Sequence, residues 1–60
     1  MSIKLVERAR AKARREGLVD EDFAATILYV SRTTLWRIVK GTRALKHHEL
    51  ARIRAYLSRP

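Results

Sequence analysis

The chain has 60 residues and no cysteine, which predicts a single domain over 1–60 and excludes disulfides and thiolate chemistry. Fourteen lysines and arginines against six acids give a formal net charge of +8, which favours a polyanionic partner such as DNA, RNA or an anionic membrane surface. The apolar runs are shorter than the roughly 18 residues of a membrane span, and the start lacks an apolar signal-peptide core. We therefore expect a cytoplasmic protein. We also expect no membrane partner, because the apolar residues around the basic segment 8–15 are mostly alanines with Val6, too small for a membrane-surface helix.

The first helix is expected over residues 3–16. Val6, Ala9 and Ala13 fall on one apolar stripe, and the remaining positions are rich in arginine and lysine. Gly17 then stands where helices commonly end with a residue in the left-handed conformation.

A second helix is expected to start after Asp20. Aspartate is a favoured N-cap, so the Asp20 side chain should cap this helix, and the acidic triplet 20–22 suits the positive end of a helix. The apolar stripe of this helix consists of Phe23, Ala24, Ile27 and Leu28.

The third helix should follow after a short gap around Tyr29 and Val30. Ser31 is its expected N-cap, and Gly41 is expected to end it. Its buried stripe has helical spacing and comprises Leu35, Ile38 and Val39.

A last helix is expected over residues 46–58, with Leu50, Ile53 and Leu57 on its inner face. Strand patterns are nearly absent, and the helices are separated by short turns. The sequence therefore predicts an all-α fold, a compact bundle of four to five short helices.

Two helices joined by a tight turn over about 20–41 form a helix-turn-helix pattern. A major groove about 12 Å wide admits one helix, and a second helix packed behind it fixes its orientation. With its apolar stripe inside, the third helix has an outer face that is free to read bases. The residues expected to contact base edges are Arg32, Thr33, Trp36 and Arg37. For Trp36, the alternative is packing against the last helix or against a partner copy.

A second set of polar residues is expected to contact DNA phosphates, which fixes register without reading sequence. This set comprises Ser31, Thr34, Lys40, Thr42 and Arg43. Because small domains gain affinity by binding inverted half-sites as dimers, Tyr56 and Leu57 are considered as homodimer contacts. The alternative for Tyr56 is that it covers the core of its own chain.

The succession RARAKARREGLVDEDFAA, a short turn, VSRTTLWRIVKGTRAL and HHELARIRAYL resembles the lambda-repressor-like, Cro and Xre group of helix-turn-helix regulators. The resemblance implies a small phage or bacterial repressor that binds an inverted-repeat operator on double-stranded DNA as a homodimer. By this likeness, Arg32 and Thr33 match the main base-reading positions, and Arg37 matches a frequent one.

The chain departs from this family pattern in its turn. Leu28 and Tyr29 stand where the family usually has a glycine, and the spacing from Phe23 to Ser31 is one residue longer than usual. Either the turn holds an extra residue or the second helix is shifted by one.

Two alternative functions stay open from the sequence. The opening VSRTTL also resembles a recombinase-type, homeodomain-like helix-turn-helix, although such modules normally accompany a catalytic domain. The arginine-rich segment 8–15 is either an RNA-binding helix or a solvated helix that attracts DNA through its long-range field.

We expect no enzymatic activity, no cofactor, no metal site and no small-molecule substrate. His47 and His48 are adjacent, so on a helix they point about 100° apart and do not easily share one metal ion. The N-cap role already accounts for Ser31, which has no histidine and acid at a useful spacing.

Overall fold

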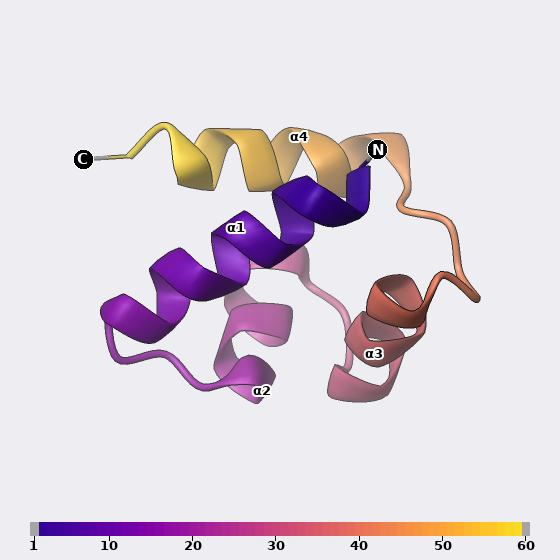
Figure 1. The fold of residues 1–60 in the computed structure, drawn as a ribbon, viewed down its shortest axis with the longest axis horizontal. Coiled ribbons are helices and arrows are strands. Elements are labelled where there is room, and N and C mark those ends of the chain that lie inside the picture. Colours follow the sequence, from indigo (N-terminus) through magenta and orange to yellow (C-terminus); the bar gives the residue numbers. More distant parts are fainter. Residues whose placement is uncertain (1, 60) are drawn as a thin grey trace.

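The computed structural model describes residues 2–59, and the regular elements of this part of the chain are all helical, which confirms the predicted all-α bundle. These elements are α1 (Ser2–Arg15), α2 (Asp20–Phe23), the π-helical turn η1 (Ala24–Leu28), α3 (Arg32–Lys40) and α4 (His47–Leu57). The helices α1 and α4 lie next to each other along the molecule, and α2 and α3 lie on the other side of α1 (Figure 1). The molecule measures 29 × 19 × 17 Å.

The predicted apolar stripes of the first three helices meet in one core. The side chains that α1, α2, η1 and α3 bury there are Val6, Ala9, Ala13, Phe23, Ala24, Ile27, Leu28, Leu35 and Ile38. The alanines let other helices approach α1 closely, because they fill little space between the backbones. Burial of these apolar side chains, at about 25 cal/mol per Å², is the main favourable contribution to the stability of so small a domain.

Helix α4 buries a different face from the one predicted. Ile53 is buried as expected, but Leu50 and Leu57 are only partly buried, and Glu49 and Tyr56 are almost fully covered. These three buried positions, 49, 53 and 56, have the i, i+4, i+7 spacing of one helical face. An acidic residue on that face conceals the pattern from a reading based on apolar periodicity.

The extra residue of the turn is accommodated within the second helix. Residues 24–28 form a π-helical turn, which takes more residues per turn than an α-helix, and the Val30 N–H donates to the Ala24 carbonyl at 3.0 Å. Tyr29 then reverses the chain in the left-handed region, at φ 58°. This is a conformation that glycine adopts at lower cost than tyrosine.

Three of the four predicted helix-end residues are confirmed. Gly17 and Gly41 have φ values of 88° and 84°, and the Ser31 hydroxyl accepts a hydrogen bond from the Thr34 N–H at 3.1 Å. The prediction for Asp20 is wrong, because Val19 occupies the N-cap position and Asp20 is already inside the helix. The carboxylate of Asp20 instead binds an arginine of α1.

Candidate nucleic-acid interface

The outer face of α3 carries the residues predicted to read bases. Leu35 and Ile38, at 0% and 1% exposure, anchor the opposite face of this helix in the core. Positions 33, 36, 37 and 40 follow the i, i+3, i+4, i+7 spacing of one exposed face. The exposed residues of α3 are Arg32, Thr33, Trp36, Arg37 and Lys40. We call these five residues the α3 face.

The cations of the α3 face are not neutralised within the fold. Among residues 2–59, the side chains of Arg32, Arg37 and Lys40 make no hydrogen bond or salt bridge. No acidic residue belongs to α3, whose sequence is RTTLWRIVK. The face therefore presents positive charge and hydrogen-bond donors to solvent.

Trp36 is partly packed against the fold and partly exposed to solvent. Its side chain is 38% exposed, and the Arg10 guanidinium carbon lies 4.8 Å from the centre of its ring. This is a cation–π contact, so the predicted alternative of packing is realised against α1 rather than against the last helix. Only part of the ring remains open to a ligand.

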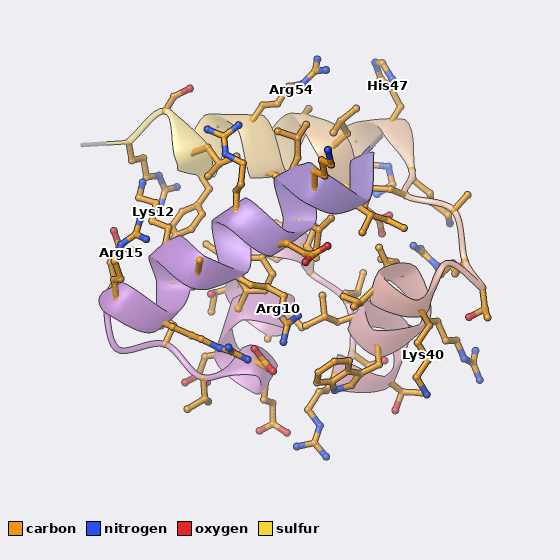
Figure 2. All side chains as sticks on the ribbon, in the orientation of Figure 1. Arg10, Lys12, Arg15, Lys40, His47 and Arg54 are labelled. Atoms are coloured by element: carbon orange, nitrogen blue, oxygen red, sulfur yellow. The ribbon has the colours of Figure 1, made fainter. Side chains whose placement is uncertain are left out.

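Arg10 also holds the start of α2. Its Nη2 donates to Asp20 Oδ2 at 3.1 Å, and its side chain is only 13% exposed. Because the guanidinium hydrogen-bonds to the carboxylate, the pKa of Asp20 lies below its ordinary value. Figure 2 shows Arg10 projecting from α1 into the space between α2 and α3. Arg10 thus connects three helices, a role that sequence periodicity does not indicate.

The two hydroxyls at the start of α3 bond to each other. Ser31 Oγ accepts from the Thr34 N–H and donates to Thr34 Oγ1 at 3.0 Å. The Thr34 hydroxyl accepts in this contact, so its own proton remains available for a phosphate oxygen. Both residues lie at the start of α3, beside the α3 face, and their contact with phosphates stays a prediction.

The loop after α3 differs from the prediction of two phosphate contacts. Thr42 is exposed, and its hydroxyl donates to the Arg37 carbonyl at 3.2 Å. Arg43 instead binds Glu49 through two hydrogen bonds, from Nη1 to Oε1 at 2.9 Å and from Nη2 to Oε2 at 3.0 Å. The structure therefore gives Arg43 an internal partner, and we do not retain it among the candidate phosphate contacts.

Glu49 is a buried charge that the sequence reading missed. Its side chain is 2% exposed, and its Oε1 also accepts from the Lys46 N–H at 2.8 Å. The hydrogen bonds from Arg43 hold the pKa of Glu49 below its ordinary value, and the bond from Lys46 acts in the same direction. Glu49 joins the loop after α3 to the start of α4. Its position three residues after Lys46, typical of the acid in a capping box, was the available signal.

The prediction that Tyr56 contacts a second copy is wrong for this fold. Tyr56 is 2% exposed, its ring centre lies 6.3 Å from that of Phe23, and its hydroxyl donates to Glu16. Burial raises the pKa of this hydroxyl, and the bond to Glu16 adds to the effect. Leu57 is partly buried, and its contact with a second copy stays a prediction.

His47 and His48 are both exposed at the start of α4. Within the described part of the chain, histidine and acidic side chains do not gather in any group of three that would hold a metal ion. None of the helices seen over residues 2–59 has the length and apolar character that crossing a membrane requires. Comparisons with protein-family models, curated proteins and solved structures found no match to this chain.

Proposed function

We propose that the protein binds double-stranded DNA by placing α3 in the major groove, and that it is a transcription regulator of the lambda-repressor-like, Cro and Xre type. The observation that carries the proposal is the α3 face itself. It groups three cations, a threonine and part of an indole on one side of a helix whose other side is anchored in the core. A helix that is fixed from behind and cationic in front has the form that major-groove recognition requires.

The roles of individual residues follow from their places on the helix. Arg32 and Thr33 lie in the first turn, which is the part that usually reaches base edges in this motif. Arg32 and Arg37 are able to bind guanine O6 and N7 through two hydrogen bonds, worth about 1–3 kcal/mol of discrimination each. Lys40, at the end of the helix, is placed for phosphate, as is the hydroxyl of Thr34 in the first turn. The hydroxyls of Ser31 and Thr42 already donate their protons within the chain, and each would have to break that bond to contact a phosphate.

The role of Trp36 is narrower than the sequence suggested. Because Arg10 lies over its ring and the residue is only 38% exposed, the indole offers part of its surface to a thymine methyl or to sugar. Arg10 also places a further positive charge behind the α3 face, although this charge is shared with Asp20.

We further propose that two copies act together on an inverted repeat as a repressor. One α3 reads only a few base pairs, and a palindromic operator with half-sites about one helical turn apart doubles that contact. Occupancy of such a site would block transcription without a further effector domain. The cytoplasm of a bacterium, or of a phage-infected bacterium, is the compartment that fits this proposal.

The test is a binding selection on random duplex DNA at about 150 mM salt, where non-specific phosphate binding is weak. We expect an enriched inverted repeat, and we expect an Arg32→Ala variant to lose the preference at one position of each half-site. Enrichment of a single, non-repeated site would retain DNA binding but reject the homodimer. Recovery of no sequence at all would reject the proposed function.

A further inference from the structure

A second basic surface lies on another flank of α1, where this helix meets the end of α4. It is a cleft of about 390 Å³ lined by Arg8, Ala11, Lys12, Arg15, Leu57 and Arg59. Four of these six residues are cationic, and none is acidic. In Figure 2, Lys12 and Arg15 lie towards the end of α1 that is remote from Lys40 on α3. We call this surface the α1–α4 cleft.

The floor of the cleft is built from fixed cations. Lys12 Nζ donates to the carbonyls of Tyr56 and Arg59, at 2.6 and 2.8 Å, and lies 4.5 Å from the centre of the Tyr56 ring. The Arg59 guanidinium carbon lies 5.6 Å from the same ring centre. Lys12 thereby occupies the negative end of the α4 dipole, where a cation is stabilised.

The walls of the cleft carry cations that have no hydrogen-bond or salt-bridge partner in the described part of the chain. Arg8 and Arg15 are exposed, and within residues 2–59 their side chains make no hydrogen bond or salt bridge. The nearby acid Glu16 accepts a hydrogen bond from the Tyr56 hydroxyl and does not line the cleft. Two fixed and two unused positive charges therefore converge without an acid between them.

The cleft and the α3 face point away from each other. Residues of an α-helix are about 100° apart, so Arg10 and Lys12 project from flanks of α1 about 160° apart. Arg10 points to Trp36 of α3, whereas Lys12 points to the end of α4. A duplex held by α3 would leave the cleft open.

We propose that the α1–α4 cleft binds the phosphodiester backbone of a second DNA duplex, so that one copy of the protein holds two duplexes. Arg8, Lys12 and Arg15 are spaced i, i+4, i+7 and form a row about 10 Å long, which suits a linear series of phosphates. Unpaired bases would need an aromatic platform, whereas no aromatic residue is among those described as lining the cleft, and the ring of Tyr56 beneath it has Lys12 and Arg59 over it. The inference rests on the proposed function for the first duplex only, since the affinity of the cleft for phosphates does not involve α3.

The experiment is a titration of isotope-labelled protein with a duplex of about 12 base pairs, long enough for one turn of the groove, followed by amide chemical shifts. We expect the amides of α3 to shift with the first equivalent, and those of Ala11, Arg15, Leu57 and Arg59 to shift with the second. Shifts confined to α3 would overturn the inference and leave the proposed function standing. Shifts confined to the cleft would do the reverse.

The variant pair Arg8→Gln/Arg15→Gln and Arg32→Gln/Arg37→Gln separates the two surfaces at equal net charge. All four residues are exposed, so both proteins should fold. At about 0.1 M salt, the loss of two phosphate contacts in the cleft should weaken the second binding step by roughly one to two orders of magnitude and leave the first unchanged. A cleft variant that keeps both steps would refute the inference. So would an oligoglutamate peptide that shifts the cleft amides at a lower concentration than the duplex, because the partner would then be an acidic protein segment.

Discussion

Two neighbouring stretches of the chain, α3 and the loop that follows it, carry similar cations but use them differently. Arg32 and Arg37 extend from α3 into solvent, whereas Arg43 binds the buried carboxylate of Glu49 through two hydrogen bonds. The formal charge of each arginine is the same. The difference is that, over residues 2–59, the fold places a carboxylate beside Arg43 and none beside Arg32 or Arg37. A basic residue therefore indicates a ligand contact only where the fold gives it no acidic partner.

The largest effect should be the loss of DNA affinity when two arginines of the α3 face are removed. We expect Arg32→Ala/Arg37→Ala to lose about 2–6 kcal/mol of binding free energy for the selected DNA site, because each arginine contributes about 1–3 kcal/mol when it reads guanine. The free energy of unfolding should change by less than about 0.5 kcal/mol, since both side chains are exposed. Fluorescence anisotropy of a labelled duplex and urea denaturation measure the two quantities. A variant that binds normally would show that the α3 face is not the interface.

Removal of the buried acid Glu49 should lower the stability of the fold and leave DNA affinity nearly unchanged. Glu49→Ala takes away the partner of Arg43 and the acceptor of the Lys46 N–H, and we expect a loss of about 2–3 kcal/mol in the free energy of unfolding. DNA affinity of the molecules that remain folded should be nearly unchanged. The matched control is Glu7→Ala, at an exposed position of α1, which should cost less than about 0.5 kcal/mol. Equal losses in the two variants would contradict the structural role of Glu49.

Apolar periodicity was sufficient to predict most of the fold. The apolar stripes of the first three helices, and the glycines that end two of them, are determined by residues close in sequence. In a small domain with one core, each apolar stripe has to face that core. The α3 face followed from the same reasoning, because the exposed side of a helix is fixed once its buried side is known.

The remaining features depend on contacts between distant residues. Nothing in the sequence near Glu49 shows that Arg43 would turn back onto it, so α4 was oriented by its leucines instead. The contact of Arg10 with Trp36 joins α1 to α3, which are separated in the chain by α2, η1 and the turn at Tyr29. That turn has a tyrosine in the left-handed conformation directly after a π-helical segment, which apolar periodicity does not indicate.

Acidification provides a further test of the internal pairs. The pKa values of Asp20 and Glu49 are lowered in the folded protein by Arg10 and Arg43, so the unfolded chain binds protons at higher pH than the folded one. The stability from these pairs is fully present above the ordinary carboxylate range and is lost as the pH falls through the folded-state values. Urea denaturation between neutral pH and about pH 3 should show this loss, with a shallower pH slope for Glu49→Ala. Equal pH slopes for the two proteins would mean that the fold does not stabilise the ionised form of Glu49.

A smaller effect than that of Glu49→Ala is expected for Arg10, the paired cation that supports the α3 face from behind. Arg10→Met retains an apolar stem but removes the contacts with Asp20 and Trp36, and we expect a cost of about 1 kcal/mol in the free energy of unfolding. Trp36 is the only tryptophan, so its fluorescence emission should change directly as the guanidinium leaves its ring. An unchanged emission spectrum would show that this contact does not persist in solution.

Arg14 supplies the control for Arg10, because it approaches the same carboxylate from a more exposed position. Its Nη2 lies 3.6 Å from Asp20 Oδ2, and its side chain is 64% exposed, against 13% for that of Arg10. An exposed ion pair is screened by water and salt, so Arg14→Gln should change the free energy of unfolding by less than about 0.5 kcal/mol and leave the Trp36 emission unaltered. If Arg14→Gln cost as much as Arg10→Met, the number of cations around Asp20 would matter more than their burial. The presence of an internal acid would then not be sufficient to explain why Arg43 stabilises the fold while Arg37 is left for a ligand.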